Sequence, residues 1–118
     1  MNSLISFGKY LFIIPMAVFG IIHFTAADQM AGMAPGGAIM VYITGVLLLA
    51  SVVSVFMGKF DKLATTLLGI MLLLFIIPHA QALSASPGEL SNILKNISLA
   101  GGAFMYASAF SKDNSYIN

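Results

Sequence analysis

The chain contains no cysteine and no arginine among its 118 residues. Without cysteine, disulfides, thiol catalysis, iron–sulfur clusters, covalently attached haem and cysteine–zinc sites are all excluded. Without arginine, the chain lacks the side chain best suited to bidentate binding of phosphate or carboxylate. The basic residues are five lysines that form no cluster, so nucleic-acid binding is not expected.

Charged side chains of either sign are also scarce. They make up 8% of the residues, whereas hydrophobic residues make up 59%. A soluble domain carries about 25% charged residues, and so few charges cannot keep its surface hydrated. The composition therefore predicts a single transmembrane domain over residues 1–118, with the lipid bilayer as its main solvent.

Four stretches of the chain are nearly free of charge and long enough to cross a membrane, which takes about 20 apolar residues in a helix. We expect spans at about 5–26, 37–57, 61–80 and 91–110. Backbone polar groups in lipid must be paired within the segment, so the spans should be helices. The expected fold class is all-α, an integral membrane four-helix bundle. The first span is long for a signal peptide and further apolar segments follow it, so we expect it to be retained.

The lysines predict the orientation of the bundle. With the N-terminus inside, Lys9, Lys59, Lys62 and Lys112 lie on the cytoplasmic side and only Lys95 lies outside. The positive-inside rule favours this N-in/C-in topology. The central turn GKFD is short, so the second and third spans should be antiparallel neighbours. We interpret the stretch GKFDK as a solvated turn and SKDNSYIN as a frayed cytoplasmic tail.

The two histidines of the chain end the first and third spans in one pattern, F-x-x-x-H. Phe19 precedes His23 by four residues, and Phe75 precedes His79 likewise. Both spans run outward, so both imidazoles are expected near the extracytoplasmic interface, with Asp28 just beyond the first. The inward spans also resemble each other, which predicts two repeated helical hairpins in parallel orientation.

The candidate ligand-binding residues are His23, His79, Asp28 and Tyr42. Pro78 removes a backbone hydrogen bond, so it should bend the helix end and direct His79 toward the bundle. The ligand could be a quinone head group, a metal ion on two imidazoles and a carboxylate, or a b-type haem with two axial histidines. Metal and haem fit less well, haem least, since histidines at span ends would place a haem half outside the bilayer.

A purely structural role for these residues is the alternative. An imidazole at a span end can be hydrated, and it interacts favourably with the helix dipole. A tyrosine can belong to the interfacial belt or to helix packing. Small residues predict the helix contacts, because they let backbones approach closely in lipid. They are Gly45 on the second span and Ser98, Gly101 and Gly102 on the fourth.

Four segments, taken in order, carry a resemblance to a known family. They are FGIIHF, APGGAIMVYITGVLLLASV, GKFDKLATTLLGIMLLLFIIPHA and LKNISLAGGAFMYA. Their order and spacing resemble the DoxX-like family over nearly the whole chain. The resemblance implies a small four-helix protein of the bacterial inner membrane. The family is named after a subunit of thiosulfate:quinone oxidoreductase, which implies proximity to quinone or sulfur redox chemistry. The chain lacks the cysteines of thiol-active relatives, which counts against direct sulfur chemistry.

We therefore expect an accessory subunit of a larger membrane complex in a redox or respiratory setting. Its partners would be the lipid bilayer and other membrane subunits or further copies of the chain. The alternative is a quinone-contacting component of a membrane oxidoreductase, with its site near the extracytoplasmic ends of the first and third helices. A small transporter is less well supported, because few polar side chains lie at mid-span. The sequence contains no catalytic motif of its own.

Overall fold

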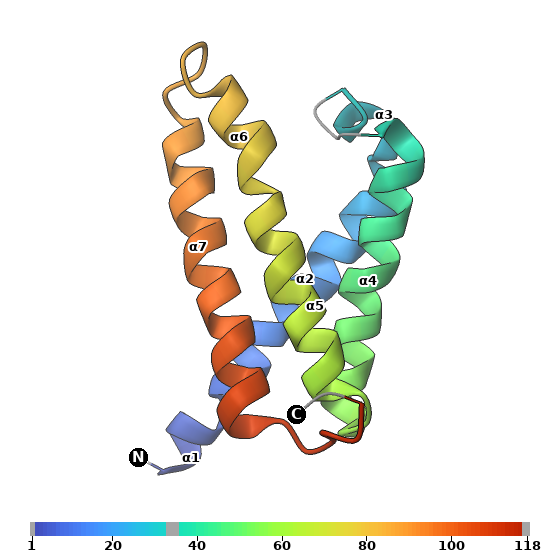
Figure 1. Ribbon diagram of the computed structural model, residues 1–118, viewed down its shortest axis with the longest axis vertical. Coiled ribbons are helices and arrows are strands. Elements are labelled where there is room, and N and C mark those ends of the chain that lie inside the picture. The colour runs from blue at the N-terminus through green and yellow to red at the C-terminus, as the bar shows by residue number, and fades with distance from the viewer. Residues whose placement is uncertain (1, 33–35, 117–118) are drawn as a thin grey trace.

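The computed structural model describes residues 2–32 and 36–116. These residues form helices joined by turns, without a strand, so the all-α prediction is confirmed for the described part of the chain. The elements are α1 (Asn2–Ser6), α2 (Gly8–Thr25), α3 (Ala27–Met30), α4 (Gly37–Met57), α5 (Asp61–Leu74), α6 (Ile76–Ala82), α7 (Glu89–Met105) and the π-helix η1 (Tyr106–Phe110) (Figure 1).

Three helical stretches are long and apolar enough to cross a membrane: Ser3–Thr25, Gly37–Met57 and Asp61–Ala82. They agree closely with the first three expected spans and indicate a membrane protein. The fourth expected span coincides with α7 and η1. By itself α7 has 17 residues and is less apolar, so it is not one of these three stretches.

The helices form two hairpins that meet through α4 and α5. α2 packs along α4 in the first hairpin, and α5 and α6 pack along α7 in the second. The hairpins converge near the α4–α5 turn and diverge toward α3 and α6 (Figure 1). α1, the α4–α5 turn and the segment after η1 lie at the convergent end.

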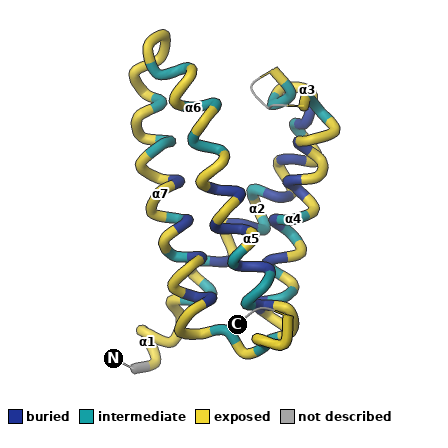
Figure 2. The backbone as a smooth tube through the Cα atoms, viewed as in Figure 1, coloured by how far each residue is buried: buried dark blue, intermediate teal, exposed yellow. Residues whose placement is uncertain are grey.

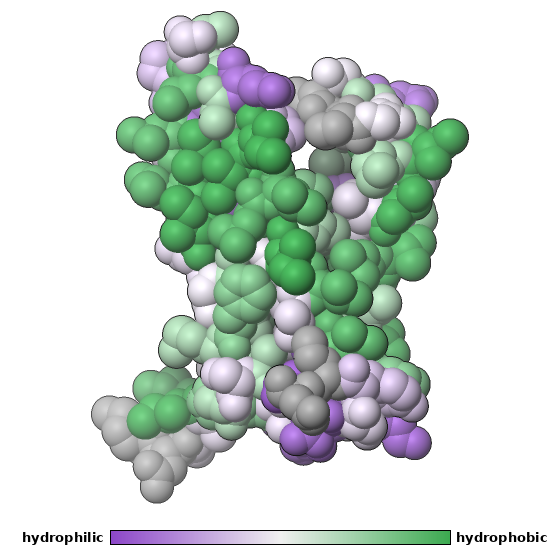
Figure 3. Space-filling view, viewed as in Figure 1, coloured by the Kyte–Doolittle hydropathy of each residue, from purple (hydrophilic) through white to green (hydrophobic). Residues whose placement is uncertain are grey.

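The core lies where the hairpins converge (Figure 2). Ile13 and Met16 of α2, Leu48 of α4 and Leu68 of α5 are each at most 1% exposed, and Ala103 of α7 is fully buried. Many large apolar side chains point outward instead. In the view of Figure 3 they cover much of the flank, and hydrophilic residues gather toward the two ends. This distribution suits a bundle whose flank contacts lipid.

α2 and α4 cross at a pair of glycines. A Cβ added at Gly20 would lie 2.8 Å from the Leu49 side chain and 3.3 Å from the Gly45 carbonyl oxygen. A Cβ at Gly45 would lie 2.9 Å from the Cβ of His23. Such distances are too short for packed carbon atoms, so the two backbones can approach this closely only because both residues are glycine.

The small residues expected to mediate packing on the fourth span lie on different faces of α7. A Cβ at Gly102 would lie 2.9 Å from the Phe12 ring of α2, so this glycine is at a helix contact. Gly101 has no heavy atom within 4 Å of such a Cβ, and Ser98 is exposed. Ser98 and Gly101 therefore face away from the described helices.

Two segments expected to be linkers are partly helical. α3 includes Asp28, and α6 continues beyond His79 to Ala82. Residues 33–35 of the first linker lie outside the described residues. The helix break that we expected at Pro78 begins earlier, since α5 ends at Leu74. Leu74 is four residues before Pro78, and proline has no N–H to donate to that carbonyl, so the regular α-helical ladder stops there.

The prediction of a solvated turn between α4 and α5 is wrong. Asp61, the first residue of α5, is 0% exposed. Its carboxylate accepts hydrogen bonds from the Tyr106 hydroxyl and from the backbone N–H groups of Lys112 and Asp113, each at 2.8 Å. The N–H of Lys62 donates to the same carboxylate at 3.0 Å. A buried carboxylate is tolerated here because it has four donors.

The prediction of a frayed tail is also wrong for the described residues. The N–H of Phe60 donates to the Asp113 carboxylate at 2.8 Å, and the rings of Phe60 and Tyr116 stack with centroids 4.7 Å apart. The hydrogen bond from Phe60, together with those from the Ser115 hydroxyl and N–H, lowers the pKa of Asp113. The segment after η1 is thus fixed against the α4–α5 turn.

Candidate functional site

A cavity of about 310 Å³ lies between the two hairpins, in the half of the molecule where they diverge. Its walls are mostly apolar and come from α2, α3, α4, α5, α6 and α7. Its size is at the lower end of the range for small-molecule sites, about 300–1,000 Å³. Five polar side chains line it: His23, Thr44, His79, Lys95 and Asn96. An apolar cavity with a few converging polar groups is the usual form of a ligand site.

His23 is held in one orientation by its own helix. Its Nδ1 lies 2.6 Å from the carbonyl oxygen of Phe19, one turn earlier in α2. A carbonyl oxygen only accepts, so Nδ1 carries the proton and Nε2 of the neutral ring is an acceptor. The ring stacks beside Phe75, with centroids 6.3 Å apart. The residue is only 7% exposed, and Nε2 makes no hydrogen bond within the described part of the chain but is accessible.

Asn96 is the second buried polar residue of the cavity, and sequence reasoning did not select it. It is 4% exposed, and its amide makes no hydrogen bond to any residue that the structure describes. The unpaired atoms of this amide are accessible from the cavity, because no side-chain nitrogen or oxygen without a partner is fully buried among the described residues. The signal in the sequence is its place in the buried stripe of α7, which continues with Ala100 and Ala103. A polar side chain in such a stripe is expected to bind something.

Lys95 and Thr44 complete the polar lining. The Lys95 ammonium lies 5.4 Å from the centroid of the Phe19 ring, and this cation–π contact connects α7 to α2 across the cavity. The Thr44 hydroxyl donates to the Val41 carbonyl at 2.8 Å, which leaves its oxygen able to accept. The cavity thus offers donors from α7 facing acceptors from α2 and α4.

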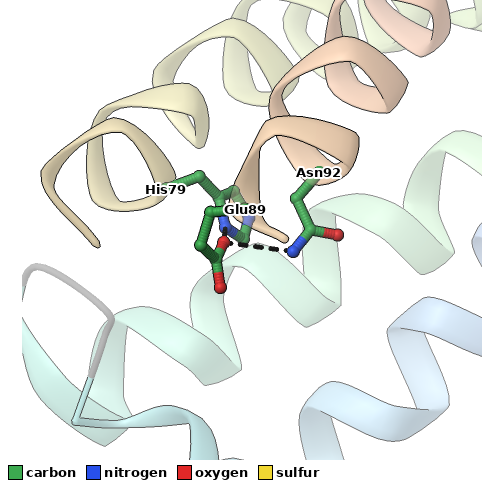
Figure 4. A network of polar contacts seen from close by, with 3 residues as sticks. All are labelled: His79, Glu89 and Asn92. Atoms are coloured by element: carbon green, nitrogen blue, oxygen red, sulfur yellow. Dashed lines mark hydrogen bonds and ion pairs between the residues drawn. The ribbon is translucent and has the colours of Figure 1, made fainter. Parts of the chain in front are cut away.

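His79 belongs to a polar network at the outer rim of the cavity (Figure 4). Its Nδ1 pairs with Oε2 of Glu89, the first residue of α7, and the Asn92 amide donates to the same oxygen at 3.1 Å. The hydrogen bond from Asn92 and the pairing with His79 lower the pKa of Glu89. The network connects α6 to the start of α7.

We expect Glu89→Gln to loosen the α6–α7 turn at neutral pH. The folded-state pKa of Glu89 is lowered, so the ionised carboxylate stabilises the turn above its ordinary pKa of 4.5 and loses this effect as the pH falls through the lowered value. A nitroxide on Ser84→Cys, a unique label in a chain without cysteine, should become more mobile in the variant at pH 7. The two proteins should converge only at acidic pH, once the pH has fallen below the lowered pKa of Glu89.

The matched control for this experiment is Ser91→Ala, an exposed position in the first turn of α7 that is outside the network. It should leave label mobility unchanged at every pH. Equal mobility of wild type and Glu89→Gln at neutral pH would contradict the role assigned to the Glu89 network.

The structure brings together two of the four candidate ligand-binding residues. His23 and His79 line the same cavity, whereas Asp28 and Tyr42 do not. Asp28 is exposed on α3. Tyr42 is 42% exposed, and its ring packs against Phe24 with centroids 5.7 Å apart. In residues 2–32 and 36–116, no group of three His, Cys, Asp or Glu side chains is placed to hold a metal ion.

Comparison of the chain with known protein families, with curated proteins and with solved structures finds no match. The DoxX-like resemblance therefore stays a prediction. The features of the structure that bear on function are the cavity, the accessible unpaired polar atoms in its lining and its place between apolar helices.

Proposed function

We propose that the chain is a four-span protein of the bacterial inner membrane, of the DoxX-like type, that binds a quinone head group in the cavity between its hairpins. The observation that carries this proposal is that His23 and Asn96, which are only 7% and 4% exposed, present accessible polar atoms without a partner among the described residues to an apolar cavity. A ligand that bears both apolar surface and hydrogen-bonding oxygens would satisfy them.

The ends of the helices support this four-span topology. α7 continues directly into η1, which gives a fourth helical stretch from Glu89 to Phe110. Four lysines belong to the end where α1, the α4–α5 turn and the segment after η1 lie (Figure 1). The positive-inside rule makes that end cytoplasmic and places the cavity in the extracytoplasmic half.

The chemistry of the lining fits both redox forms of a quinone. The carbonyl oxygens of the oxidised ring accept hydrogen bonds, for which Lys95 and Asn96 supply donors. The hydroxyl groups of the reduced ring donate, and the Nε2 atom of His23 accepts. The apolar walls, with the Phe19 and Phe75 rings among them, suit the face of the ring.

A bound quinone would exchange electrons with another protein. A chain without cysteine supplies no iron–sulfur cluster and no covalent haem, so electrons would pass to or from a partner subunit. The proposal therefore makes this chain a quinone-contacting component of a membrane oxidoreductase.

The test is quinone binding by the purified protein in lipid nanodiscs, measured by titration with a short-chain benzoquinone and by the rise in melting temperature. His23→Leu and Asn96→Leu should each weaken binding by about ten-fold or more, because each removes a hydrogen bond from a buried site. Tyr42→Phe and Asp28→Asn are the controls outside the cavity and should bind like wild type.

Absence of saturable quinone binding by the wild-type protein would overturn the proposal. So would wild-type affinity in both leucine variants, provided that circular dichroism shows them folded. Either result would leave the cavity without the assigned ligand.

The second candidate is an accessory subunit without a ligand of its own. The outward-facing small residues Ser98 and Gly101 on α7 favour it, because they would let a helix of a partner or of a second copy approach closely. Gentle detergent extraction and native mass spectrometry would test it. Gly101→Leu should then dissociate the assembly and leave the isolated chain folded.

A further inference from the structure

The size of the cavity limits how much of a ligand it can enclose. About 310 Å³ is at the lower end of the range for small-molecule sites, enough for a head group and too little for a long apolar tail as well. This step rests on the proposed function, in which the head group lies against His23 and Asn96. The tail of a membrane quinone must therefore leave the protein through an opening in the cavity wall.

The wall between α4 and α6 has the features of such an opening. Met40 and Val41 line the cavity from α4, and Phe75 and Pro78 line it from the α5–α6 side. Met40 is nevertheless 41% exposed, so it lies at the rim where the cavity meets the surface. Figure 3 shows the surface hollowed between the two hairpins, with apolar residues on both sides.

Little holds α4 to α6 across this gap. Among the described residues, no hydrogen bond, ion pair or aromatic contact joins the two helices, and they diverge toward the outer end (Figure 1). The described contacts of α4 are mainly with α2 and α5. The gap can therefore admit an alkyl chain without breaking a polar interaction.

The other sides of the cavity are less suitable for an apolar tail. On the side between α2 and α7, the Lys95 ammonium lies over the Phe19 ring, so a charge borders that wall. The outer end carries the network of His79, Glu89 and Asn92. An alkyl chain beside these groups would remove water from charges without replacing their hydrogen bonds.

We propose that the gap between α4 and α6, bordered by Met40 and Pro78, is a lateral opening to the outer leaflet. The ligand enters through it with the head group first, and its apolar tail stays between the helices and in the lipid. The natural ligand is accordingly a membrane-dissolved amphiphile with a long tail.

The chain has no cysteine, so a single thiol can be placed at the rim and enlarged chemically. Met40→Cys modified with a bulky methanethiosulfonate reagent should obstruct the opening. Ile39→Cys with the same reagent is the matched control, because Ile39 is the adjacent residue of α4, is 73% exposed and does not line the cavity. Binding of a long-tailed isoprenoid quinone and of a tail-less benzoquinone would be measured in nanodiscs by stopped-flow and at equilibrium.

Modified Met40→Cys should bind the long-tailed quinone at least about ten-fold more slowly or more weakly than the unmodified variant, with the tail-less quinone affected much less. Modified Ile39→Cys should bind both like wild type. If wild type binds both quinones and the obstructed variant does too, the lateral opening is wrong and the proposed function stands. If wild type binds neither quinone, the lateral opening and the proposed function are both wrong.

Discussion

Asp61→Ala is expected to lower the free energy of unfolding by about 3 kcal/mol or more, because a buried donor left without its acceptor costs about 1–3 kcal/mol and several donors share this carboxylate. The carboxylate is fully buried and accepts hydrogen bonds from Tyr106, Lys112, Asp113 and Lys62. Alanine would leave the Tyr106 hydroxyl and two backbone N–H groups of the tail without an acceptor. Each such donor carries a desolvation penalty of its own.

Two further variants separate charge from shape. Asp61→Asn keeps the volume but places an NH₂ group against N–H donors, so it should lose nearly as much stability as alanine. Asp113→Asn changes a partly exposed carboxylate that accepts from Phe60 and Ser115, and it should lose much less. Unfolding in mixed detergent, followed by circular dichroism, would measure all three. A loss below about 1 kcal/mol for Asp61→Ala would contradict the network.

Asp61 lies at the end of the molecule opposite to the cavity. Its hydrogen bonds fix the start of α5 to the π-helix that follows α7 and to the tail, all at the end where the hairpins converge. These bonds lie within the second hairpin. The two hairpins are held together by the α4–α5 contacts and by the core that includes Leu48 and Leu68, so they can diverge at the other end without separating. The space that forms the cavity depends on contacts at the opposite end of the bundle.

The helices themselves could be predicted from the sequence because what a membrane helix requires is a property of one short segment. A membrane helix needs a run of apolar residues of a certain length, and three such runs became the three long apolar helices. The positions of the histidines were predicted to be related because each one ends a span. That His23 is buried and oriented by the Phe19 carbonyl depends on the neighbouring hairpin, which the local pattern does not show.

Two candidate residues were chosen by their position along the chain and lie elsewhere in space. Tyr42 directly follows Val41, which lines the cavity, and one residue is a rotation of about 100° around a helix. That rotation places Tyr42 on the outer face against Phe24. Periodicity places a residue on a helix face, and only the packing of the helices decides which face borders a cavity.

The network of Asp61 could not be predicted because its partners are distant in sequence. Tyr106 is 45 residues away and Asp113 is 52. An aspartate between two lysines in a short turn has the local appearance of a solvated residue. Asn96 was within reach of sequence reasoning, since it is the one amide in the buried stripe of α7.

Gly45→Leu is expected to destabilise the protein and to abolish quinone binding. A Cβ at this position would lie 2.9 Å from the His23 Cβ and 3.1 Å from the Phe24 ring, so α2 must move away from α4. Overpacking of this kind costs about 1–3 kcal/mol. The movement would also displace His23, whose Nε2 atom faces the cavity in the proposed site.

Gly101→Leu is the matched control, because it makes the same change in helix propensity at a position with no heavy atom within 4 Å of the added Cβ. In the isolated protein it should unfold no more easily than wild type and should bind quinone with unchanged affinity. Equal stability of the two leucine variants would contradict the close crossing of α2 and α4.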